Sequence, residues 1–459
     1  MSSHQGQQAQ PIHFYPPKQS LRYGIRETAG RHNRYRWAVV ALTQVLFYGL
    51  CWLQWQGNPV LRFDFERQQI HWMGSLFGPQ DLLVLALLMV GGALALFAVS
   101  TLAGRLFCGF ACPQSVYTTM FMWIEQRLQG SPGQRQRRAK TGQWLQSGLR
   151  TAATWGTWGL LSLWTGWTLA AYFTPAPELW ARTLSADLGF WELFSIFFYG
   201  GFMMVQAGWL REKVCQHMCP YARFQGVMGN SHTLNVSYDQ QRGEPRTVMA
   251  KRTPATAAAC IDCGLCVDVC PVGIDIRNGP QYECIGCGLC IDACDRVMTG
   301  LRQPTGLIRW ASASGRSWRT VWWQPRVAVY AGLLGVALLA VLLLSLTRIP
   351  LQVDVLRDRN VLSRITRDGH VENAYRLHLQ NYDTVAHRYT IRVEGLPDLR
   401  LLTPPDTLVA AGSERTLVVT VLAPANDNAL SVNPLQFTVQ ASDSPEQQRT
   451  RASTLLFPR

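Results

Sequence analysis

Residues 260–294 read Cys260-Ile-Asp-Cys263-Gly-Leu-Cys266-Val-Asp-Val-Cys270 and then, after thirteen residues that begin with Pro271, Cys284-Ile-Gly-Cys287-Gly-Leu-Cys290-Ile-Asp-Ala-Cys294. Both copies have the spacing Cys-x2-Cys-x2-Cys-x3-Cys, the bacterial ferredoxin spacing for two [4Fe–4S] clusters. Three thiolates from one tight loop can occupy three corners of a cubane, and Gly264, Gly286 and Gly288 let the backbone fold closely around it. The pattern therefore predicts a two-cluster ferredoxin-like insert.

In this motif the fourth cysteine of each copy ligates the other cluster. The predicted ligands are Cys260, Cys263, Cys266 and Cys294 for cluster I, and Cys284, Cys287, Cys290 and Cys270 for cluster II. Asp295 replaces the proline that follows the first copy, but all eight ligands are present. Zinc sites usually have two Cys-x2-Cys pairs a dozen or more residues apart, and disulfides need an oxidising compartment, so both alternatives are disfavoured.

The chain has 459 residues and a formal net charge of +14 at pH 7. This length suggests about three domains. The basic residues gather at the ends of long apolar runs, where they indicate membrane topology rather than nucleic-acid binding. The sequence contains no nucleic-acid recognition motif, so nucleic acid is not an expected partner.

Five runs without a charged side chain are long enough to span a bilayer, which takes about 20 apolar residues. They are residues 37–55, 82–104, 151–174, 193–210 and 327–347. Any one run could be a buried core helix, but tryptophans near the ends of several runs are typical of membrane interfaces. The sequence therefore predicts a multi-domain membrane protein with a five-helix transmembrane domain, the first four helices forming two hairpins within 37–210.

The basic segments should face the cytoplasm of a bacterial inner membrane. They are the polar tail 1–36, which is a poor signal peptide, and the loop 105–150. Counting spans then places 211–326, with the ferredoxin domain at about 255–300, in the cytoplasm. Its thiols would stay reduced there and free to bind iron. The loops 56–81 and 175–192 and everything after the fifth helix, residues 348–459, would be periplasmic.

Residues 348–459 alternate polar and apolar side chains in short runs separated by turn residues. Examples are Tyr375, Leu377 and Leu379, and later Phe437 and Val439. This period predicts about seven short strands in an immunoglobulin-like β-sandwich. The segment has no cysteine and nothing resembling a catalytic site, so a docking or assembly role is the expectation.

A second cysteine pattern follows the second and fourth predicted helices. It is Cys108-x3-Cys112-Pro113 in one hairpin and Cys215-x3-Cys219-Pro220 in the other, which indicates an internal repeat. If each helix continued through its motif, the two thiols would lie on one face with Cβ atoms about 5–6 Å apart. Proline after the second cysteine should end that helix.

Four thiolates at one membrane surface can bind a soft metal such as Cu(I) or cycle between dithiol and disulfide. His217, inside the second motif, is a candidate additional metal ligand. The alternative is that these cysteines only pack, as expected for the lone Cys51 in the first predicted helix. Two pairs at equivalent places favour a functional site.

This combination closely resembles the FixG/CcoG family of accessory proteins of cbb3-type cytochrome c oxidase, from about residue 30 onward. The resemblance implies a membrane-bound reductase of Cu(II) to Cu(I) that supports assembly of the oxidase, with its subunits or copper-delivery factors as partners. Copper would then be the substrate, reduced at Cys108, Cys112, Cys215 and Cys219, and the electron donor is not specified. A homo-oligomer is compatible with the sequence.

Two other functions fit parts of the sequence. The hairpin-end motif also occurs in membrane ferredoxins of the NapH and NosR types, which suggests a quinol-linked electron conduit to another reductase. No quinone pocket is evident in the sequence. A non-redox assembly scaffold, in which the clusters are structural, is the third hypothesis, and it is disfavoured because such clusters generally transfer electrons.

Overall fold

The computed structural model describes residues 25–55, 57–248, 258–315, 321–357, 363–424 and 431–457. Three parts of the sequence predictions lie outside these ranges: residues 1–24 of the N-terminal tail, 255–257 of the ferredoxin region, and the turn residues Asn426 and Asp427. The chain forms two compact units. One comprises 1–49, 90–171 and 179–337, and the other comprises 50–89, 172–178 and 338–459.

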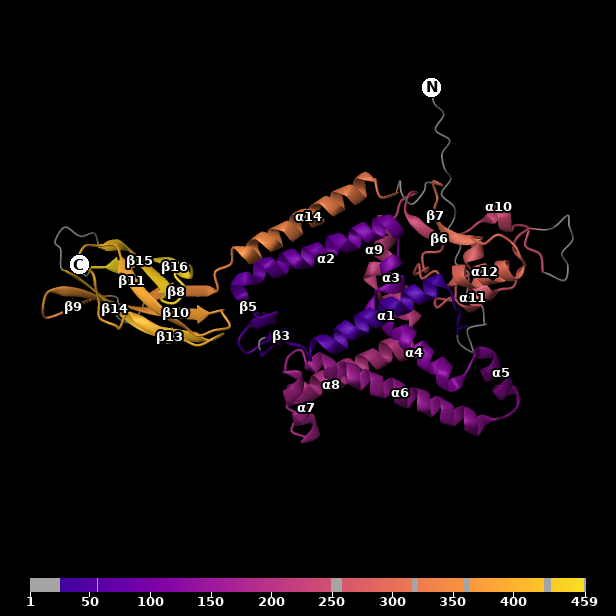
Figure 1. The fold of residues 1–459 in the computed structure, drawn as a ribbon, viewed down its shortest axis with the longest axis horizontal. Helices are drawn as coiled ribbons and strands as arrows, with labels where there is room; N and C mark the ends of the chain where they lie inside the picture. Colours follow the sequence, from indigo (N-terminus) through magenta and orange to yellow (C-terminus); the bar gives the residue numbers. More distant parts are fainter. Residues whose placement is uncertain are drawn as a thin grey trace, which may run out of the picture. The chain divides into compact units, whose positions relative to one another are not determined.

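Helices dominate the first unit (Figure 1). They include α1 (Arg31–Leu50), α2 (Leu82–Ala103), α3 (Leu106–Phe110), α4 (Pro113–Gln129), α5 (Pro132–Lys140), α6 (Trp144–Ala170), α7 (Ala176–Leu184), α8 (Phe190–Met203), α9 (Pro220–Met228) and α14 (Pro325–Leu346). Helices α2, α7 and α14 each have one end in the second unit. Two π-helical segments, η3 (Met204–Leu210) and η4 (Val214–Met218), follow α8. A helix therefore accompanies each of the five predicted runs, with different ends.

Within the described residues, three helices are long and apolar enough to cross a membrane: Pro79–Ala103, Phe190–Leu210 and Pro325–Leu346. This finding supports a membrane protein. The other two predicted runs coincide with α1 and α6. Helix α1 ends at Leu50, earlier than expected, because Gln54–Trp55 form the strand β1, paired with β2 (Asn58–Pro59).

Close backbone contacts pack α6 against α8. A Cβ atom at Gly166 would lie 2.3 Å from the carbonyl oxygen of Ile196, and one at Gly200 would lie 3.0 Å from that of Ser162. Glycine is therefore required where these two helices meet, as is common in membrane helix pairs. One turn before Ser162 on α6, the indole of Trp158 stacks on Phe121 of α4 at 5.3 Å between ring centroids and donates to the Phe121 carbonyl.

The ferredoxin region is a small layered structure in the first unit. Strands β6 (Leu234–Tyr238) and β7 (Ile308–Ser312) pair antiparallel. They pack with α11 (Leu265–Asp268), η7 (Ile276–Asn278) and α12 (Leu289–Gly300), and a short α10 (Gln240–Gly243) follows β6. Buried aliphatic side chains and most of the repeat cysteines share one core here, which places the thiols away from water.

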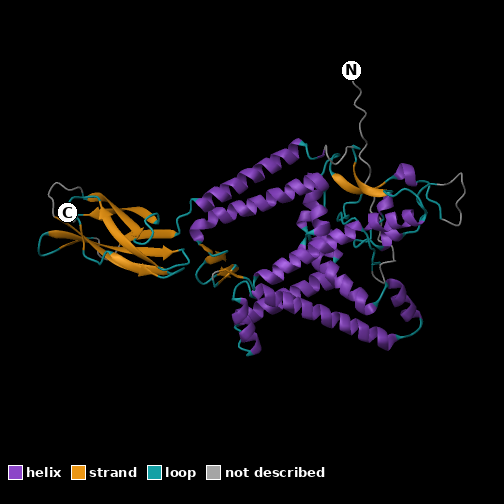
Figure 2. Cartoon of the chain, viewed as in Figure 1, coloured by secondary structure: helices purple, strands orange, loops and turns teal. Residues whose placement is uncertain are grey.

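The second unit contains the β-sandwich (Figure 2). Its strands are β8 (Leu351–Arg357), β9 (Arg364–Ile365), β10 (His370–Asn381), β11 (His387–Glu394), β12 (Arg400–Leu401), β13 (Asp406–Val409), β14 (Glu414–Pro424), β15 (Val432–Ala441) and β16 (Gln448–Leu456). One sheet has the order β12-β14-β10-β8 with β9 beside β10, and the other has the order β13-β11-β15-β16. The sandwich therefore has nine strands in the described residues, two of them only two residues long, where the sequence predicted about seven.

The predicted alternation of side chains is confirmed in the sandwich. Tyr375, Leu377, Leu379, Phe437 and Val439 are fully buried. The rings of Tyr375 and Phe437 meet edge to face at 4.9 Å between centroids. Residues two apart face the same side of a strand, so these runs form the apolar layer between the two sheets.

A small antiparallel sheet that the sequence did not predict also belongs to the second unit. It consists of β3 (Leu61–Asp64), β4 (Gln69–Trp72) and β5 (Ser75–Phe77), followed by the 3-10 turn η2 (Pro79–Asp81). Arg348 connects this part to the sandwich, because its guanidinium binds both Asp81 oxygens at 3.0 and 2.8 Å and also donates to the Leu76 carbonyl. Its guanidinium carbon lies 4.5 Å from the Phe77 ring centroid.

Replacing Arg348 with methionine should destabilise the second unit by about 2–4 kcal/mol, because a half-enclosed carboxylate would lose a bidentate charged partner. Thermal unfolding of the purified protein in detergent would measure the effect, and protease cleavage within residues 61–81 should become faster. Arg392→Met, on the exposed face of β11, is the matched control. Equal unfolding temperatures for the two variants would contradict this role.

Candidate iron–sulfur and thiol site

The eight repeat cysteines line two separate pockets. One pocket is lined by Cys260, Cys263, Cys266 and Cys294, together with apolar side chains such as Leu307 and Ile308. The other is lined by Cys270, Cys284, Cys287 and Cys290, with Cys266 at its edge. Each pocket thus gathers the four cysteines predicted for one cluster, including the crossed-over fourth ligand.

The two cysteine loops have the same backbone form. Gly264 and Gly288 have φ of +71° and +72° and immediately precede α11 and α12. Gly286 has φ +65°, and the equivalent residue of the first copy, Asp262, has φ +49°. Asparagine and aspartate tolerate this left-handed region better than other non-glycine residues. These turns wrap each loop around its pocket, and the thiol-lined, apolar pockets fit [4Fe–4S] clusters.

Helix α12 carries cysteines of both pockets and is fixed to the start of α1. The carboxylate of Asp292 accepts from the backbone N–H groups of His32 and Asn33 at 3.2 and 2.8 Å, and it also contacts the His32 ring at 2.9 Å. It therefore caps the free N–H groups of the first turn of α1 from another element. A negative charge at a helix N-terminus is also favourable electrostatically.

The hairpin motifs are not continuous helices, contrary to the sequence expectation. Helix α3 ends at Phe110, and Cys112 has an extended backbone with φ −62° and ψ 129° before α4 begins at Pro113. In the second motif Cys215 lies in η4, and Cys219, with φ −77° and ψ 112°, precedes α9, which begins at Pro220. Proline starts a new helix in each case, because its fixed φ and missing N–H suit the first helical position.

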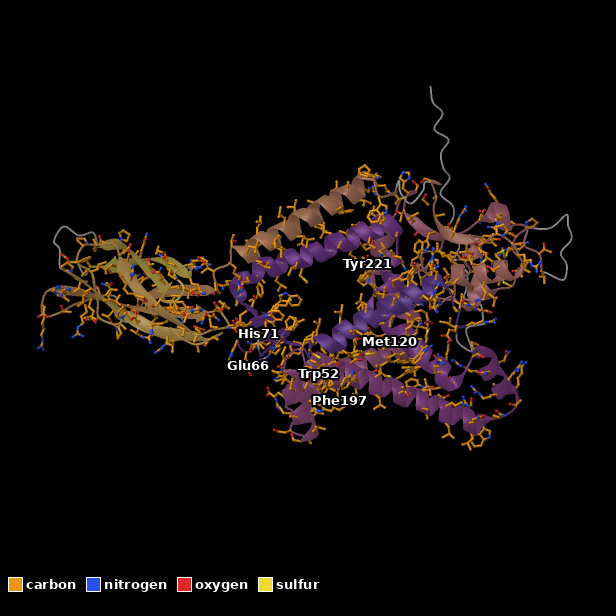
Figure 3. The ribbon with its side chains drawn as sticks, viewed as in Figure 1. Trp52, Glu66, His71, Met120, Phe197 and Tyr221 are labelled. Atoms are coloured by element: carbon orange, nitrogen blue, oxygen red, sulfur yellow. The ribbon has the colours of Figure 1, made fainter. Side chains whose placement is uncertain are left out.

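A buried glutamine that the sequence analysis missed joins the two motifs. The Cys108 thiol donates to Oε1 of Gln225 on α9 at 3.4 Å. Nε2 of Gln225 donates to the hydroxyl oxygens of Ser100 and Tyr221 at 3.0 and 2.8 Å. Tyr221, labelled in Figure 3, directly follows Pro220. No spacing rule singles out Gln225; a polar residue one helical turn after Tyr221 was the only available signal.

The first motif touches the loop of the second pocket directly. A Cβ atom at Gly109 would lie 2.7 Å from the carbonyl oxygen of Ile285 and 2.9 Å from the backbone of Cys287. Cys108 belongs to the same apolar cluster as Cys287 and Cys270. Only glycine allows this approach, so the hairpin thiols adjoin the cysteine loop predicted for cluster II.

The second motif also contacts this region. Gln216 donates to the Val272 carbonyl at 3.3 Å, and the Tyr282 hydroxyl donates to the Gln216 carbonyl at 3.4 Å. Arg105 donates to the Ala222 carbonyl, and its guanidinium carbon lies 5.8 Å from the Tyr282 ring centroid. Both hairpin ends therefore contact the segment between Cys270 and Cys287, the first at Ile285 and Cys287 and the second at Val272 and Tyr282.

The four hairpin thiols lie within electrostatic range of one another. Burial raises the pKa of Cys108 to about 12, and charge on Cys112, Cys215 and Cys219 adds to the effect. Burial likewise raises the pKa of Cys215 to about 11. The thiols of Cys108 and Cys215 are therefore protonated at neutral pH, and a bound metal would displace their protons.

Within the described part of the chain, no group of three or more His, Cys, Asp or Glu side chains is close enough to hold a single metal ion. His217 is exposed at the end of η4. The structure thus gathers the four hairpin thiols loosely and does not bring His217 into a common ligand set. A [4Fe–4S] cluster holds its four thiolates farther apart than a single metal ion does. The absence of a compact ligand group within the described residues therefore also agrees with the two cluster pockets.

Comparisons with known protein families agree with this organisation. The family described as a 4Fe-4S dicluster domain matches residues 210–313. A second family, described as a 4Fe-4S binding domain, matches residues 85–132, which include Cys108 and Cys112. The immunoglobulin-like fold at the C-terminal of FixG matches residues 341–458. The chain therefore carries two iron–sulfur-binding domains and a FixG-type sandwich.

Whole-length relatives decide the family. Protein RdxA of Cereibacter sphaeroides is 34% identical over 396 residues, covering 82% of each chain. The nitrogen fixation protein FixG of Rhizobium meliloti is 32% identical over 415 residues, covering 81% of this chain and 79% of that protein. This chain belongs to the FixG family. The ferredoxin-type protein NapH of Haemophilus influenzae is 27% identical over 206 residues, covering 40% of this chain and 66% of that protein.

The FixG-family assignment and the pockets together make this chain an iron–sulfur electron-transfer protein related also to ferredoxin-type proteins such as NapH. Its described helices include three that could cross a membrane, in agreement with a membrane location. The family assignment does not by itself define the reaction that the protein serves or its orientation in the membrane.

Replacing Gly109 with alanine should force the first motif away from the Ile285–Cys287 backbone and cost about 1–3 kcal/mol. We expect a lower unfolding temperature and a lower iron content per chain. Gly148→Ala in α6 is the matched control, since a Cβ atom there meets nothing within 4 Å. The contact would be unimportant if both variants kept full iron and equal stability.

Proposed function

We propose that this protein is a membrane-bound cupric reductase that delivers Cu(I) during assembly of a cbb3-type cytochrome c oxidase. The observation that supports the proposal is the contact of Gly109 with the Ile285–Cys287 loop, because thiols of the first hairpin motif, which we propose bind copper, adjoin a cluster pocket. We assign the clusters as the sequence predicted: Cys260, Cys263, Cys266 and Cys294 would hold cluster I, and Cys284, Cys287, Cys290 and Cys270 would hold cluster II. When bound, these groups supply one-electron transfer.

The substrate site in this proposal is formed by Cys108, Cys112, Cys215 and Cys219, with His217 as a candidate outer ligand. Cu(II) would gain one electron there and leave as Cu(I), with no bond broken in the protein. Thiolates bind Cu(I) more tightly than Cu(II), so the site would raise the copper potential and favour reduction. Because the thiols are loosely gathered, we expect a pair of thiols to hold the ion rather than all four together.

The apolar surroundings of the motif would assist this chemistry. Cys108 is buried, and its thiol is hydrogen-bonded to Gln225, which Ser100 and Tyr221 hold in place. This network would orient the thiol that lies nearest to the cluster II loop. We infer five membrane-spanning helices, with α1 and α6 as the two additional spans, and a cytoplasmic ferredoxin region and a periplasmic sandwich, from the distribution of basic residues.

A variant with Cys108, Cys112, Cys215 and Cys219 all replaced by serine should lose copper reduction. We expect the rate to fall by about tenfold or more, since even outer-shell changes at metal sites cost about 10–100-fold. The assay reduces the clusters of the purified protein chemically, adds Cu(II), and follows Cu(I) with a chelating dye. Iron per chain should remain at the wild-type value.

Cys51→Ser is the control, because this buried cysteine belongs to neither motif. An unchanged rate in the fourfold variant would rule out the proposed copper site. Loss of iron together with loss of activity would instead assign the hairpin cysteines to an iron–sulfur group, as the family match over residues 85–132 allows.

A second function, a quinol-linked electron conduit, is favoured by the partial similarity to NapH. It predicts that a quinol analogue reduces the clusters of the purified protein in the absence of copper. Measuring cluster absorbance after quinol addition separates the two functions. A scaffold without redox activity would show neither quinol oxidation nor copper reduction while retaining its iron.

A further inference from the structure

Arg36, near the start of α1, is a deeply buried cation. Its residue is only 3% exposed, and its Nε atom is enclosed without a hydrogen-bond partner. The charges that act on it come from Cys287 and Cys270, and among the described residues no carboxylate contributes. A buried guanidinium without a negative partner is costly, so its presence needs an explanation.

The position of Arg36 follows from the anchoring of α1. His32, one helical turn earlier, packs tightly on Gly288. A Cβ atom added to Gly288 would lie 2.7 Å from the His32 ring. Gly288 lines the pocket predicted for cluster II. Side chains at i and i+4 share a helix face, so Arg36 continues along the face that meets this pocket.

The first pocket has a different electrostatic environment. Arg277, the cation nearest Cys266, pairs with Asp275 at 2.7 Å and also with Asp262. Asp295 adds negative charge beside Cys294. The positive charge at cluster I is therefore largely neutralised within the protein.

Arg105 adds to the positive charge at the second pocket, where it acts on Cys284 against the opposing charge of Glu283. Arg36 and Arg105 are therefore the cations that act on cysteines of the second pocket, and neither forms an ion pair with a carboxylate within the described part of the chain. The two pockets thus differ in how their cations are paired, although their cysteine patterns are the same.

We propose that Arg36 raises the reduction potential of cluster II above that of cluster I, so that electrons collect beside the hairpin motifs. Reduction adds one negative charge to a cluster, and a buried cation stabilises that charge strongly because the surroundings have a low dielectric constant. When both clusters are bound, one electron would pass from cluster I to cluster II, with no change in bonds or protons. The inference rests on the electron-transfer function and does not depend on copper as the substrate.

The test is a redox titration of the full-length protein in detergent, followed by electron paramagnetic resonance. Cys260→Ser and Cys284→Ser variants assign the two signals to cluster I and cluster II. In Arg36→Gln the equilibrium constant for reducing cluster II should fall at least about tenfold, which is about 59 mV for one electron. Cluster I should change by less than about half that shift.

Arg34→Gln is the matched control, because Arg34 is exposed on the same helix. Arg36→Lys retains the charge and should keep cluster II near the wild-type potential. The proposal is overturned if Arg36→Gln leaves cluster II unchanged, or if it shifts both clusters equally. If the Arg36→Gln variant loses its iron, the Arg36→Lys variant is decisive. A wild-type reduction potential of cluster II in Arg36→Lys supports the charge effect. A tenfold change in the equilibrium constant for reducing cluster II, or loss of iron, rejects it.

Discussion

The approach of Gly109 to the backbone of Ile285 and Cys287 is the constraint on which the redox part of the structure depends. A single methyl group there would overlap the cysteine loop. Because this approach is so close, the first hairpin motif and the predicted cluster II loop share one apolar core. The ferredoxin region is therefore part of the same packed unit as the helix ends, and its position is set by backbone contact instead of by flexible linkers.

Several polar contacts maintain this arrangement from other directions. Asp292 caps α1 and fixes the helix that carries Cys290 and Cys294, while Gln114 of α4 donates to the carbonyls of Gln206 and Arg211 at the end of η3. Carbonyls at a helix end lack intrahelical partners, so Gln114 satisfies the Arg211 carbonyl and adds a second donor to the Gln206 carbonyl, which also accepts from the Arg211 N–H. The hairpin cysteines thus lie on segments held at both ends, which suits a site that must keep its thiols near the cluster loop.

The sequence was sufficient for features that a spacing encodes. Cysteine intervals grouped the same residues that line each pocket, and a period of two predicted the apolar layer of the sandwich. It was incomplete where one residue type has two roles: the proline after Cys112 was expected to end a helix, and α3 does end before it, but the same proline also begins α4. The apolar run at 37–55 was also too long, since tryptophans suit a strand such as β1 as well as a helix end.

Other residues that contribute to the site belong to no recognisable sequence pattern. Gln225 and Arg36 act through contacts between elements far apart in the chain, and a lone glutamine or arginine at a helix end is common in any membrane protein. Their importance comes from burial, which only the fold supplies.

The two pockets also differ in exposure to solvent. Cys263 is exposed at the first pocket, whereas Cys287 is buried at the second. Electron transfer slows with distance, so a soluble donor would reach the first pocket more readily, and the hairpin thiols adjoin the second. With two arginines at the second pocket that form no ion pair within the described residues, exposure and charge would direct electrons the same way, from the first pocket toward the hairpin thiols.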